Sequence, residues 1–302
     1  MELFLTELTR HGIAWQEHCL LSEHSSFRIG GAARCAVFPH MPYELMIAVR
    51  LAQDASLPYF VVGAGCNTLF DDRGFDGVVI FTKRMKRIVK NGSLWAVDAG
   101  VLLSTLAQEA LKDSLTGLEF AHGIPGTLGG AVFMNAGAFG GEIKDVCIES
   151  RYYNVQTLEF GKLSGATQSF AYRKSFYTDH PECLIVGATL SLNRGVPAEI
   201  EERMQEYKRR RSSSQPLEYP SAGSVFKRPE GDFAARLIDV CGLKGLRVGG
   251  AEVSEKHAGF IVNRGGATSE DVKRLIDIIR ERVLKETGVL LECEIRFLEH
   301  KR

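Results

Sequence analysis

The 302-residue chain is 45% hydrophobic, which is enough apolar material for about two domains with a sizeable buried core. Lysine and arginine together number 37, and aspartate and glutamate also number 37, so the formal net charge is zero. This balance argues against the broad basic field with which proteins bind nucleic acid or anionic membranes, and it leaves small ligands as the expected partners.

The N-terminal segment and the cysteines indicate the compartment. Residues 1–7 carry acids where a secretory signal carries positive charge, and no apolar run approaches the ~18 residues of a membrane-spanning helix. The seven cysteines are odd in number and widely scattered, with no C-x-x-C pair and no zinc-ligand spacing. We therefore expect a soluble, cytoplasmic protein with free thiols and no metal site.

Short apolar strands alternate with helical stretches over the first two-thirds of the chain, which is typical of α/β or α+β folds. Two successive sets of these elements predict a cofactor domain with two lobes, residues 1–85 and 86–196. Strands are predicted at 36–38, 59–62, 78–81, 95–97, 151–154 and 184–192, and helices at 44–55 and 104–111.

A turn cluster at 193–197 separates this part from a smaller α+β domain, residues 197–302. Apolar residues at helical spacing then predict a helix from about residue 200 to the arginines at 209–211. We therefore place the boundary between the two domains near residue 196.

Three elements are predicted in the C-terminal domain. A short helix ends at Gly242, and a longer one begins at Thr268 and is capped by Gly288, which suits a left-handed C-terminal cap. Residues 291–297 alternate between apolar and charged side chains, which predicts a final strand that returns towards the cofactor domain.

The segment GAGCNT at residues 63–68 directly follows an apolar strand, where a dinucleotide fingerprint would lie. The Rossmann pattern fails because position 68 is threonine instead of the third glycine, and residues 82–84 offer no acid for a ribose hydroxyl. A tight turn explains an isolated Gly-x-Gly about as well as a cofactor contact does.

A second glycine-rich segment is more informative, because seven of the nineteen residues from 123 to 141 are glycine. Glycine lacks the Cβ that would keep a diphosphate away from backbone N–H groups, and successive N–H groups in a turn form an anion-binding concavity. Close packing of a helix on a sheet is the alternative explanation. We favour contact with the pyrophosphate of a nucleotide cofactor.

Four segments occur in an order that resembles one family: SFRIGG at 26–31, GAGCNTL at 63–69, DRGFDG at 72–77 and GIPGTLGG at 123–130. They are similar to segments of the UDP-N-acetylenolpyruvoylglucosamine reductases (MurB), and the resemblance extends from about residue 26 to 297. It implies an FAD-binding domain of the vanillyl-alcohol-oxidase type and NADPH as hydride donor. The family usually has serine where this chain has Cys66, and a thiol donates only weakly.

The resemblance also implies which residues meet the cofactor. Both glycine segments would flank the FAD pyrophosphate, and Arg296 would lie near the flavin. The wider superfamily can attach FAD covalently through His or Cys, but this family is expected to bind it non-covalently, His122 included. The residues transferred to the cofactor are Gly63, Ala64, Gly65, Cys66, Asn67, Thr68, Gly123, Ile124, Pro125, Gly126, Thr127, Gly130, Ala131, Asn135 and Arg296.

Three further matches, YRKS at 172–175, SAGSVFKRP at 221–229 and LECEIR at 291–296, imply the catalytic residues Arg173, Ser224 and Glu294. In the family's reaction a hydride reaches the β-carbon of an enolpyruvyl ether, and negative charge develops on the α-carbon and its carboxylate. A guanidinium suits that carboxylate, a serine hydroxyl can give the α-carbon its proton, and the glutamate would orient or share protons.

Substrate contacts are predicted at Tyr172, Arg173, Gln215, Lys227 and Arg228, and Lys227 is also a candidate to stabilise the charge left on the serine. Each catalytic candidate has an ordinary explanation when it is considered alone. An arginine commonly makes a surface salt bridge, the serine lies in no G-x-S-x-G elbow, and Glu294 shares a strand face with other charged residues.

The resemblance therefore predicts NADPH-dependent reduction of UDP-N-acetylglucosamine enolpyruvate to UDP-N-acetylmuramate via FAD, in bacterial peptidoglycan synthesis, by a monomer. Residues 215–220 lead directly into the serine segment, as in the shorter subclass that lacks a Tyr-bearing loop. One alternative is an FAD oxidase of the same superfamily that acts on an alcohol or sugar. The other is a nucleotide-binding protein without redox chemistry.

Overall fold

The structure, a computed structural model, describes residues 1–300. The chain forms two compact units. Unit 1 comprises Met1–Gln16, Cys35–Ala64 and Gly77–Arg211, and unit 2 comprises Glu17–Arg34, Gly65–Asp76 and Ser212–Arg302. These units are defined by packing, and the domain boundary predicted near residue 196 from the turn cluster at 193–197 stays a prediction.

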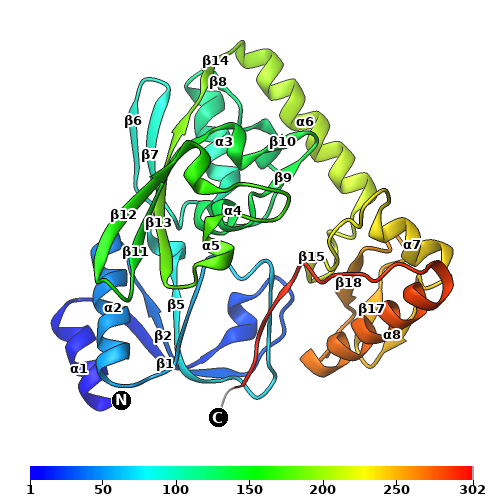
Figure 1. The fold of residues 1–302 in the computed structure, drawn as a ribbon, viewed down its shortest axis with the longest axis horizontal. Coiled ribbons are helices and arrows are strands. Elements are labelled where there is room, and N and C mark those ends of the chain that lie inside the picture. The colour runs from blue at the N-terminus through cyan, green and yellow to red at the C-terminus, as the bar shows by residue number, and fades with distance from the viewer. Residues whose placement is uncertain (301–302) are drawn as a thin grey trace. The chain divides into compact units, whose positions relative to one another are not determined.

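The N-terminal sheet has the strand order β1-β2-β5-β3 (Figure 1). Its strands β3 and β5 run parallel. Within unit 1, apolar side chains of helices α1 and α2 pack with side chains of β2 and β5 in one buried cluster that includes Leu8, Leu45 and Ile80. The bounds are α1 Glu2–Arg10, β1 Ala14–Leu20, β2 Ala32–Phe38, α2 Pro42–Asp54, β3 Tyr59–Val62 and β5 Phe75–Phe81.

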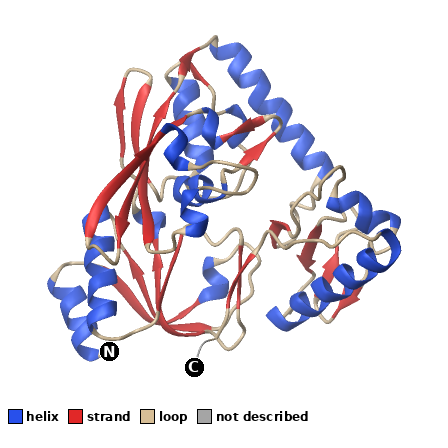
Figure 2. Ribbon diagram, viewed as in Figure 1, coloured by secondary structure: helices blue, strands red, loops and turns tan. Residues whose placement is uncertain are grey.

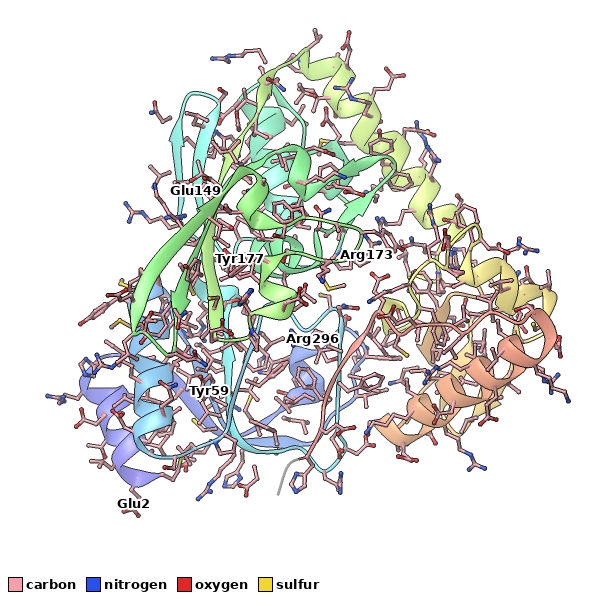
Figure 3. All side chains as sticks on the ribbon, in the orientation of Figure 1. Glu2, Tyr59, Glu149, Arg173, Tyr177 and Arg296 are labelled. Carbon is pink, nitrogen blue, oxygen red and sulfur yellow. The ribbon has the colours of Figure 1, made fainter. Side chains whose placement is uncertain are left out.

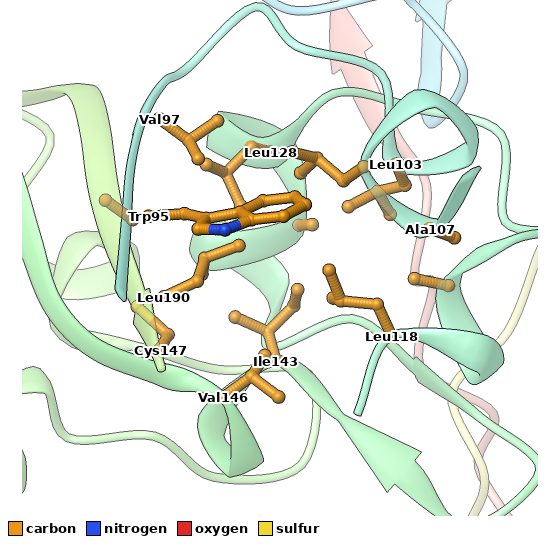
Figure 4. Packing of buried hydrophobic residues seen from close by; sticks show 14 of the residues in the cluster. Trp95, Val97, Leu103, Ala107, Leu118, Leu128, Ile143, Val146, Cys147 and Leu190 are labelled. Carbon is orange, nitrogen blue, oxygen red and sulfur yellow. The ribbon is translucent and has the colours of Figure 1, made fainter. Parts of the chain in front are cut away.

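The second sheet of unit 1 is antiparallel throughout, in the order β12-β11-β13-β7-β6. Helices α3 and α4 lie against one face of it (Figure 2). The fully buried Trp95 is at the centre of this core (Figure 4). The bounds are β6 Ile88–Asn91, β7 Leu94–Asp98, α3 Leu103–Lys112, α4 Leu128–Met134, β11 Cys147–Asn154, β12 Glu159–Ser164 and β13 Cys183–Ser191.

Smaller elements complete this part of the chain. Two short pairings, β8 with β14 and β9 with β10, are antiparallel. The long helix α6 follows β14 and carries the residues that connect unit 1 to unit 2 along the chain. The bounds are β8 Leu115–Thr116, β9 Gly137–Ala138, β10 Gly141–Glu142, α5 Phe176–Asp179, β14 Asn193–Arg194 and α6 Pro197–Ser214.

Unit 2 contains an antiparallel sheet in the order β15-β18-β17-β16, with helices α7 and α8. Strands β4 and β19 pair in parallel. Phe27, Leu69 and the apolar face of α8 share one buried cluster. The bounds are β4 Thr68–Phe70, β15 Ser221–Ser224, α7 Ala234–Val240, β16 Arg247–Val248, β17 Ala251–Val253, β18 Phe260–Asn263, α8 Ser269–Thr287 and β19 Arg296–Leu298.

The predicted final strand at 291–297 is wrong in its extent, because regular strand structure covers only β19. The expected alternation is present, since Leu291 and Ile295 are buried and Glu292 is exposed. The backbone changes partner within the segment: Glu294 N–H donates to Val225 O at 2.7 Å, whereas Arg296 N–H donates to Asn67 O at 2.9 Å. A segment that leaves one neighbour for another forms no continuous ladder.

Candidate active site

The loop before α4 is fixed to the neighbouring segment of unit 1 by backbone hydrogen bonds. Leu103 N–H donates to Gly126 O at 3.1 Å, Leu128 N–H to Val101 O at 2.8 Å and Gly129 N–H to Ala99 O at 2.8 Å. Thr127 occupies the N-cap position of the helix. The glycine-rich segment therefore enters α4 along a path that its own backbone hydrogen bonds hold in place.

Two glycines of the segment 123–141 are explained by packing within unit 1. A Cβ on Gly129 would lie 2.9 Å from Ala99 Cβ, and a Cβ on Gly141 would lie 2.6 Å from Phe120 Cδ1. Real Cβ atoms do not approach other atoms so closely. Part of the glycine density that we assigned to a cofactor thus serves close packing, which the sequence analysis considered as the alternative.

Gly63 and Thr127 connect the two glycine segments. A Cβ on Gly63 would lie 2.3 Å from Thr127 Oγ1, so the two residues are neighbours within unit 1. Space is open around Gly126, and the nearest atom to a Cβ on Gly130 would be the same Thr127 hydroxyl, at 3.9 Å. Residues predicted from separate motifs therefore meet here and leave room beside their backbones.

The Thr127 hydroxyl is the strongest indication of a ligand-binding site in unit 1. The side chain is 1% exposed, and its Oγ1 has no hydrogen-bond partner within residues 1–300. A buried hydroxyl without a partner costs about 1–3 kcal/mol, so such atoms normally have one. A phosphate oxygen is a suitable partner, and these residues fit the pyrophosphate of FAD.

His122 has a second buried atom of this kind, because its Nδ1 also has no partner in the described part of the chain. Burial lowers the pKa of this imidazole, and the positive charge of Lys208 lowers it further. The ring is therefore neutral at pH 7, with an acceptor or donor available to a ligand. The sequence analysis did not include His122 among the cofactor residues, since no motif distinguished it.

Asn135 ends α4 in a left-handed conformation, with φ of 42°. Its Nδ2 donates to Glu142 Oε2 at 2.9 Å and to Ala171 O at 3.1 Å, and its Oδ1 accepts from Lys144 N–H at 3.0 Å. The side chain was predicted to contact the cofactor. Both of its amide donors are instead engaged within unit 1.

Tyr172 and Arg173 occupy the two central positions of a tight turn. Figure 3 labels Arg173. Ala171 and Lys174 close the turn with two backbone hydrogen bonds, of 3.0 and 3.2 Å. The backbone of Arg173 is left-handed, with φ of 53°, which is uncommon for a residue with a long side chain. The Arg173 Cζ lies 5.2 Å from the centre of the half-exposed Tyr172 ring.

In unit 2, Ser26 connects the first glycine segment to the serine segment. Its N–H donates to Gly65 O at 3.3 Å, and its Oγ donates to Ser221 O at 2.7 Å and lies 3.4 Å from Cys66 O. Burial raises the pKa of the Cys66 thiol, so it is protonated at neutral pH. A protonated thiol can donate a hydrogen bond only weakly, as the sequence predicted for position 66. Ser26 was quoted within a motif, but its connecting role was not predicted.

Ser224 is the last residue of β15 and pairs with Phe260 of β18. The register shifts between Ser221 and Ser224, and Gly223 lies between them with φ of 78°. A bulge of this kind re-aims the side chain that follows it, and only glycine adopts such a φ without strain. The sequence Ala-Gly-Ser thus sets the direction of the half-buried Ser224 side chain.

Glu294 lies on the segment beside that of Ser224. Its N–H donates to Val225 O at 2.7 Å, and its carbonyl accepts from Asn67 Nδ2 at 3.1 Å. The Asn67 side chain, predicted to contact the cofactor, thus holds the backbone at Glu294. The structure therefore brings Ser224 and Glu294 onto adjoining segments of unit 2, while Arg173 belongs to unit 1.

Lys227 forms a salt bridge with the exposed Glu292 carboxylate across the same two segments. A second substrate candidate, Arg228, places its Cζ 4.3 Å from the centre of the Phe233 ring. Gln215 directly follows α6, and Arg296 opens β19 in register with Thr68. Lys227 and Arg228 therefore have partners within unit 2.

Known proteins similar to this chain cover almost its full length. The UDP-N-acetylenolpyruvoylglucosamine reductase of Caldicellulosiruptor bescii is 43% identical over 295 residues, which is 96% of this chain and 93% of that protein. The reductase of Clostridium novyi is 42% identical over 94% of this chain and 92% of its own. The crystal structure of the Thermus caldophilus enzyme (MurB) superposes with a TM-score of 0.79 at 35% identity, covering 95% and 99% of the two chains.

Two family profiles match separate parts of the chain. One, described as an FAD binding domain, matches residues 33–156. With the glycine segments, this match defines the chain as an FAD-binding protein, and its similarity to the reductases makes it an FAD-dependent oxidoreductase. The other, described as the C-terminal domain of UDP-N-acetylenolpyruvoylglucosamine reductase, matches residues 215–298. The chain belongs to the UDP-N-acetylenolpyruvoylglucosamine reductase family.

Family membership confirms three predictions: an FAD-binding fold of the vanillyl-alcohol-oxidase type with a C-terminal domain, FAD as cofactor, and reductase rather than oxidase or purely binding activity. The roles of individual residues stay predictions. None of the helices within residues 1–300 is both long and apolar enough to cross a membrane.

Proposed function

We propose that this chain reduces UDP-N-acetylglucosamine enolpyruvate to UDP-N-acetylmuramate with NADPH, as a step of bacterial peptidoglycan synthesis. The observation that supports this most strongly is the similarity to reductases over 96% of the chain. When bound, FAD supplies a carrier that accepts a hydride from NADPH and delivers it to the β-carbon of the enolpyruvyl group.

Residues of both glycine segments would hold the FAD pyrophosphate. The Thr127 hydroxyl would donate to a phosphate oxygen, which gives that buried group the partner it lacks within residues 1–300. Gly126 and Gly130 would let backbone N–H groups approach the phosphates, since a Cβ at either position would have no atom closer than 3.9 Å, and Gly63 would leave room for the Thr127 hydroxyl beside its backbone. Asn67 would act less directly, because its amide holds the backbone at Glu294.

Arg173 would pair with the substrate carboxylate. As the β-carbon gains a hydride, negative charge moves onto the α-carbon and that carboxylate. A guanidinium presents two parallel N–H donors to a carboxylate and stabilises the developing charge. The tight turn between Ala171 and Lys174 would give the guanidinium a fixed origin.

Ser224 would give its hydroxyl proton to the α-carbon, so that the carbon–carbon double bond becomes a single bond with one hydride and one proton added. The oxygen then regains a proton from solvent. Lys227 is a poorer candidate to stabilise the resulting charge than we expected, since its ammonium already pairs with Glu292. Glu294 is the remaining candidate on the adjoining segment, as a group that orients or shares the proton.

Tyr172, Gln215 and Arg228 are proposed contacts to the rest of the sugar nucleotide. We also propose that the enzyme is a cytoplasmic monomer, which accords with its balanced charge and small-molecule substrates. Light scattering of the purified holoenzyme at several concentrations measures the oligomeric state, and a mass of twice the chain would contradict this part.

Ser224→Ala tests the proposed chemistry. In the variant, bleaching of the flavin by NADPH should proceed at the wild-type rate, while its recolouring by the enolpyruvyl sugar nucleotide should slow by about 100-fold or more, because general acid catalysis contributes about that much. Stopped-flow absorbance at the flavin band follows both half-reactions.

Ser221→Ala is the matched control. It removes a hydroxyl from the other end of β15, where the Ser26 bond is made to the Ser221 backbone and survives the change. Its two half-reactions should match the wild type. If Ser224→Ala slows both half-reactions equally, the serine supports the flavin site instead. If the wild-type flavin is bleached by NADPH but never recoloured by the substrate, the reductase proposal fails.

A further inference from the structure

We propose that Asn135 is a positioning residue for Arg173: its side-chain amide fixes the turn that presents the guanidinium to the substrate. This inference rests on the catalytic role proposed for Arg173, and it replaces the cofactor contact predicted for Asn135.

The geometry connects the two residues directly through the backbone. Asn135 Nδ2 donates to Ala171 O at 3.1 Å, and Ala171 is the residue whose N–H and carbonyl both bond to Lys174 to close the turn around Arg173. The Ala171 carbonyl therefore accepts from both the turn and the Asn135 side chain. Movement of that amide would displace the base of the turn.

The turn requires such an anchor because its backbone is strained. A left-handed φ of 53° at Arg173 is unfavourable for a residue that carries a Cβ, and it persists only where its surroundings hold it. A second anchor lies on the other side of the turn, where the buried Ser175 donates from Oγ to Phe133 O at 2.8 Å. Both anchors attach the turn to the C-terminal end of α4.

Electrostatics adds a second connection through Glu142. Its Oε2 accepts from Asn135 Nδ2 at 2.9 Å and lies 2.8 Å from Lys144 Nζ. The hydrogen bond from Lys144 lowers the pKa of this carboxyl most, and the bond from Asn135 and the charges of Lys144 and Arg173 lower it further. The carboxylate is therefore ionised at neutral pH and attracts the guanidinium. Asn135 holds both the turn and the anion that faces its arginine.

The same bonds argue against a direct cofactor contact. An amide group offers two donors and one acceptor oxygen, and Asn135 uses both donors on Glu142 and Ala171 and the oxygen on Lys144 N–H. The residue is 1% exposed. Its left-handed conformation is one that asparagine tolerates better than most residues, so the position favours Asn for its backbone as well as its amide.

The test uses two variants of the holoenzyme. Asn135→Gly keeps the left-handed backbone and removes the amide, and Asn135→Asp keeps size and shape but removes both donors and places a charge beside Glu142. For each, FAD content and bleaching by NADPH should stay within about twofold of the wild type. Recolouring by the enolpyruvyl substrate should slow about 10- to 100-fold, the scale of a misplaced catalytic group.

The double variant with Arg173→Ala shows whether the effect passes through the arginine. In the Arg173→Ala background, Asn135→Gly should slow recolouring by less than about twofold more, because there is no guanidinium left to position. Asn154→Asp is the matched control, since this residue also uses its amide within unit 1, accepting from Gln156 N–H at 2.8 Å. Its half-reactions should match the wild type.

Three results would overturn the inference. Loss of FAD or of the NADPH step in the Asn135 variants would assign the amide to the cofactor. Full additivity with Arg173→Ala would make Asn135 a general structural residue. If recolouring is slow in Arg173→Ala but normal in the Asn135 variants, the arginine keeps its proposed role and the positioning role of Asn135 is refuted. If recolouring is normal in Arg173→Ala, the role proposed for the arginine itself is refuted.

Discussion

The Thr127 hydroxyl allows a prediction in which two measurements change in opposite directions. Thr127→Val removes a buried hydroxyl that has no partner within residues 1–300 and keeps the shape of the side chain. The apoprotein should keep its stability or gain up to about 1 kcal/mol, since an unsatisfied polar group disappears. FAD affinity should fall about 10-fold, because a hydrogen bond to a charged phosphate is lost. Chemical denaturation and fluorescence titration measure the two quantities.

Thr82→Val is the matched control. Thr82 is also buried in unit 1, but its Oγ1 donates to Val62 O at 3.4 Å. Loss of this hydrogen bond should lower the free energy of unfolding of the apoprotein and leave FAD affinity unchanged. Equal FAD affinity of wild type and Thr127→Val would show that the hydroxyl at 127 does not face the cofactor.

A second residue-scale prediction concerns pH. The buried Asp71 carboxylate accepts from Arg73 at the backbone N–H, Nε and Nη2, at 2.9 to 3.0 Å. The Arg73 side-chain hydrogen bond is the main cause of an Asp71 pKa far below its ordinary value of 3.8. A group whose folded pKa is lowered contributes its full stability above its unfolded pKa, and it loses that contribution progressively as the pH falls through the folded pKa.

Asp71→Asn should therefore lower the free energy of unfolding most at pH 6 to 7, and this difference should begin to shrink as the pH falls below about 4, with much of it still present at pH 3. Urea denaturation of both proteins at several pH values gives the difference directly. A difference that stays constant down to pH 3 would contradict a role for the ionised carboxylate.

Candidate residues could be selected from motifs, but their neighbours could not be predicted. Arg173, Ser224 and Glu294 were selected from the resemblance and their roles stay predictions, while the structure adds how the first two are presented, on a tight turn and after a bulge. Asn135 was predicted to contact the cofactor, and Gly129 was considered only as part of the glycine segment. Their actual neighbours, Ala171 and Ala99, are distant in sequence, and no local pattern predicts such contacts.

At the scale of elements, helix α8 depends on a residue of the glycine motif at 72–77. Asp72 Oδ2 accepts from Ser269 N–H at 2.6 Å and from Ser269 Oγ at 2.7 Å, so it binds the first residue of the helix. Asp72→Ala should lower the free energy of unfolding by about 1–2 kcal/mol, because the helix loses a charged N-terminal acceptor. Denaturant unfolding followed by circular dichroism measures this loss.

Asp76→Ala provides the comparison within the same motif. The Asp76 side chain is 59% exposed. Within residues 1–300 its one salt bridge is a surface ion pair with Arg34, at 3.5 Å. Its removal should change stability by less than about 0.5 kcal/mol. Equal losses in the two variants would show that the Asp72 carboxylate does not stabilise the start of α8.

Elements with complete local signals were predicted well, and elements that depend on distant partners were not. Helix α8 was predicted from its period, and it starts after Thr268 and ends at the left-handed Gly288. The final strand had an equally clear alternation, but strand structure also needs a continuous neighbour. The segment changes from Val225 to Asn67 as its partner, and these pairings are not encoded locally.

At the scale of the whole molecule, each unit has its own buried apolar clusters. Unit 1 contains the clusters around Trp95 and around Leu45, and unit 2 contains the cluster around Ile276. Composition predicted about two domains, but not the path of the chain, because residues 17–34 and 65–76 belong with the C-terminal residues. Hydrophobic periodicity reports only on local structure, so it does not show that these two N-terminal segments pack with the C-terminal part of the chain.

Removal of FAD tests the cofactor assignment on the molecule as a whole. A ligand that binds only the folded protein raises its stability by RT ln(1 + [L]/Kd), which is about 2.7 kcal/mol at a concentration 100 times Kd. For a chain of this size that corresponds to roughly 4 °C in Tm. Thermal melts of apoprotein with increasing FAD should show a rise that continues with concentration.

A comparison of the Tm shifts caused by FAD and by riboflavin shows which part of the cofactor contributes most of the binding free energy. Thr127 and the open backbone at Gly126 and Gly130 are proposed to hold the pyrophosphate, which riboflavin lacks. At equal concentration riboflavin should therefore raise Tm by much less than FAD. In the Thr127→Val apoprotein, the shift with FAD should shrink and the shift with riboflavin should stay the same. Equal shifts for FAD and riboflavin in the wild type would place the binding energy on the isoalloxazine ring and contradict a pyrophosphate cradle in the glycine segments.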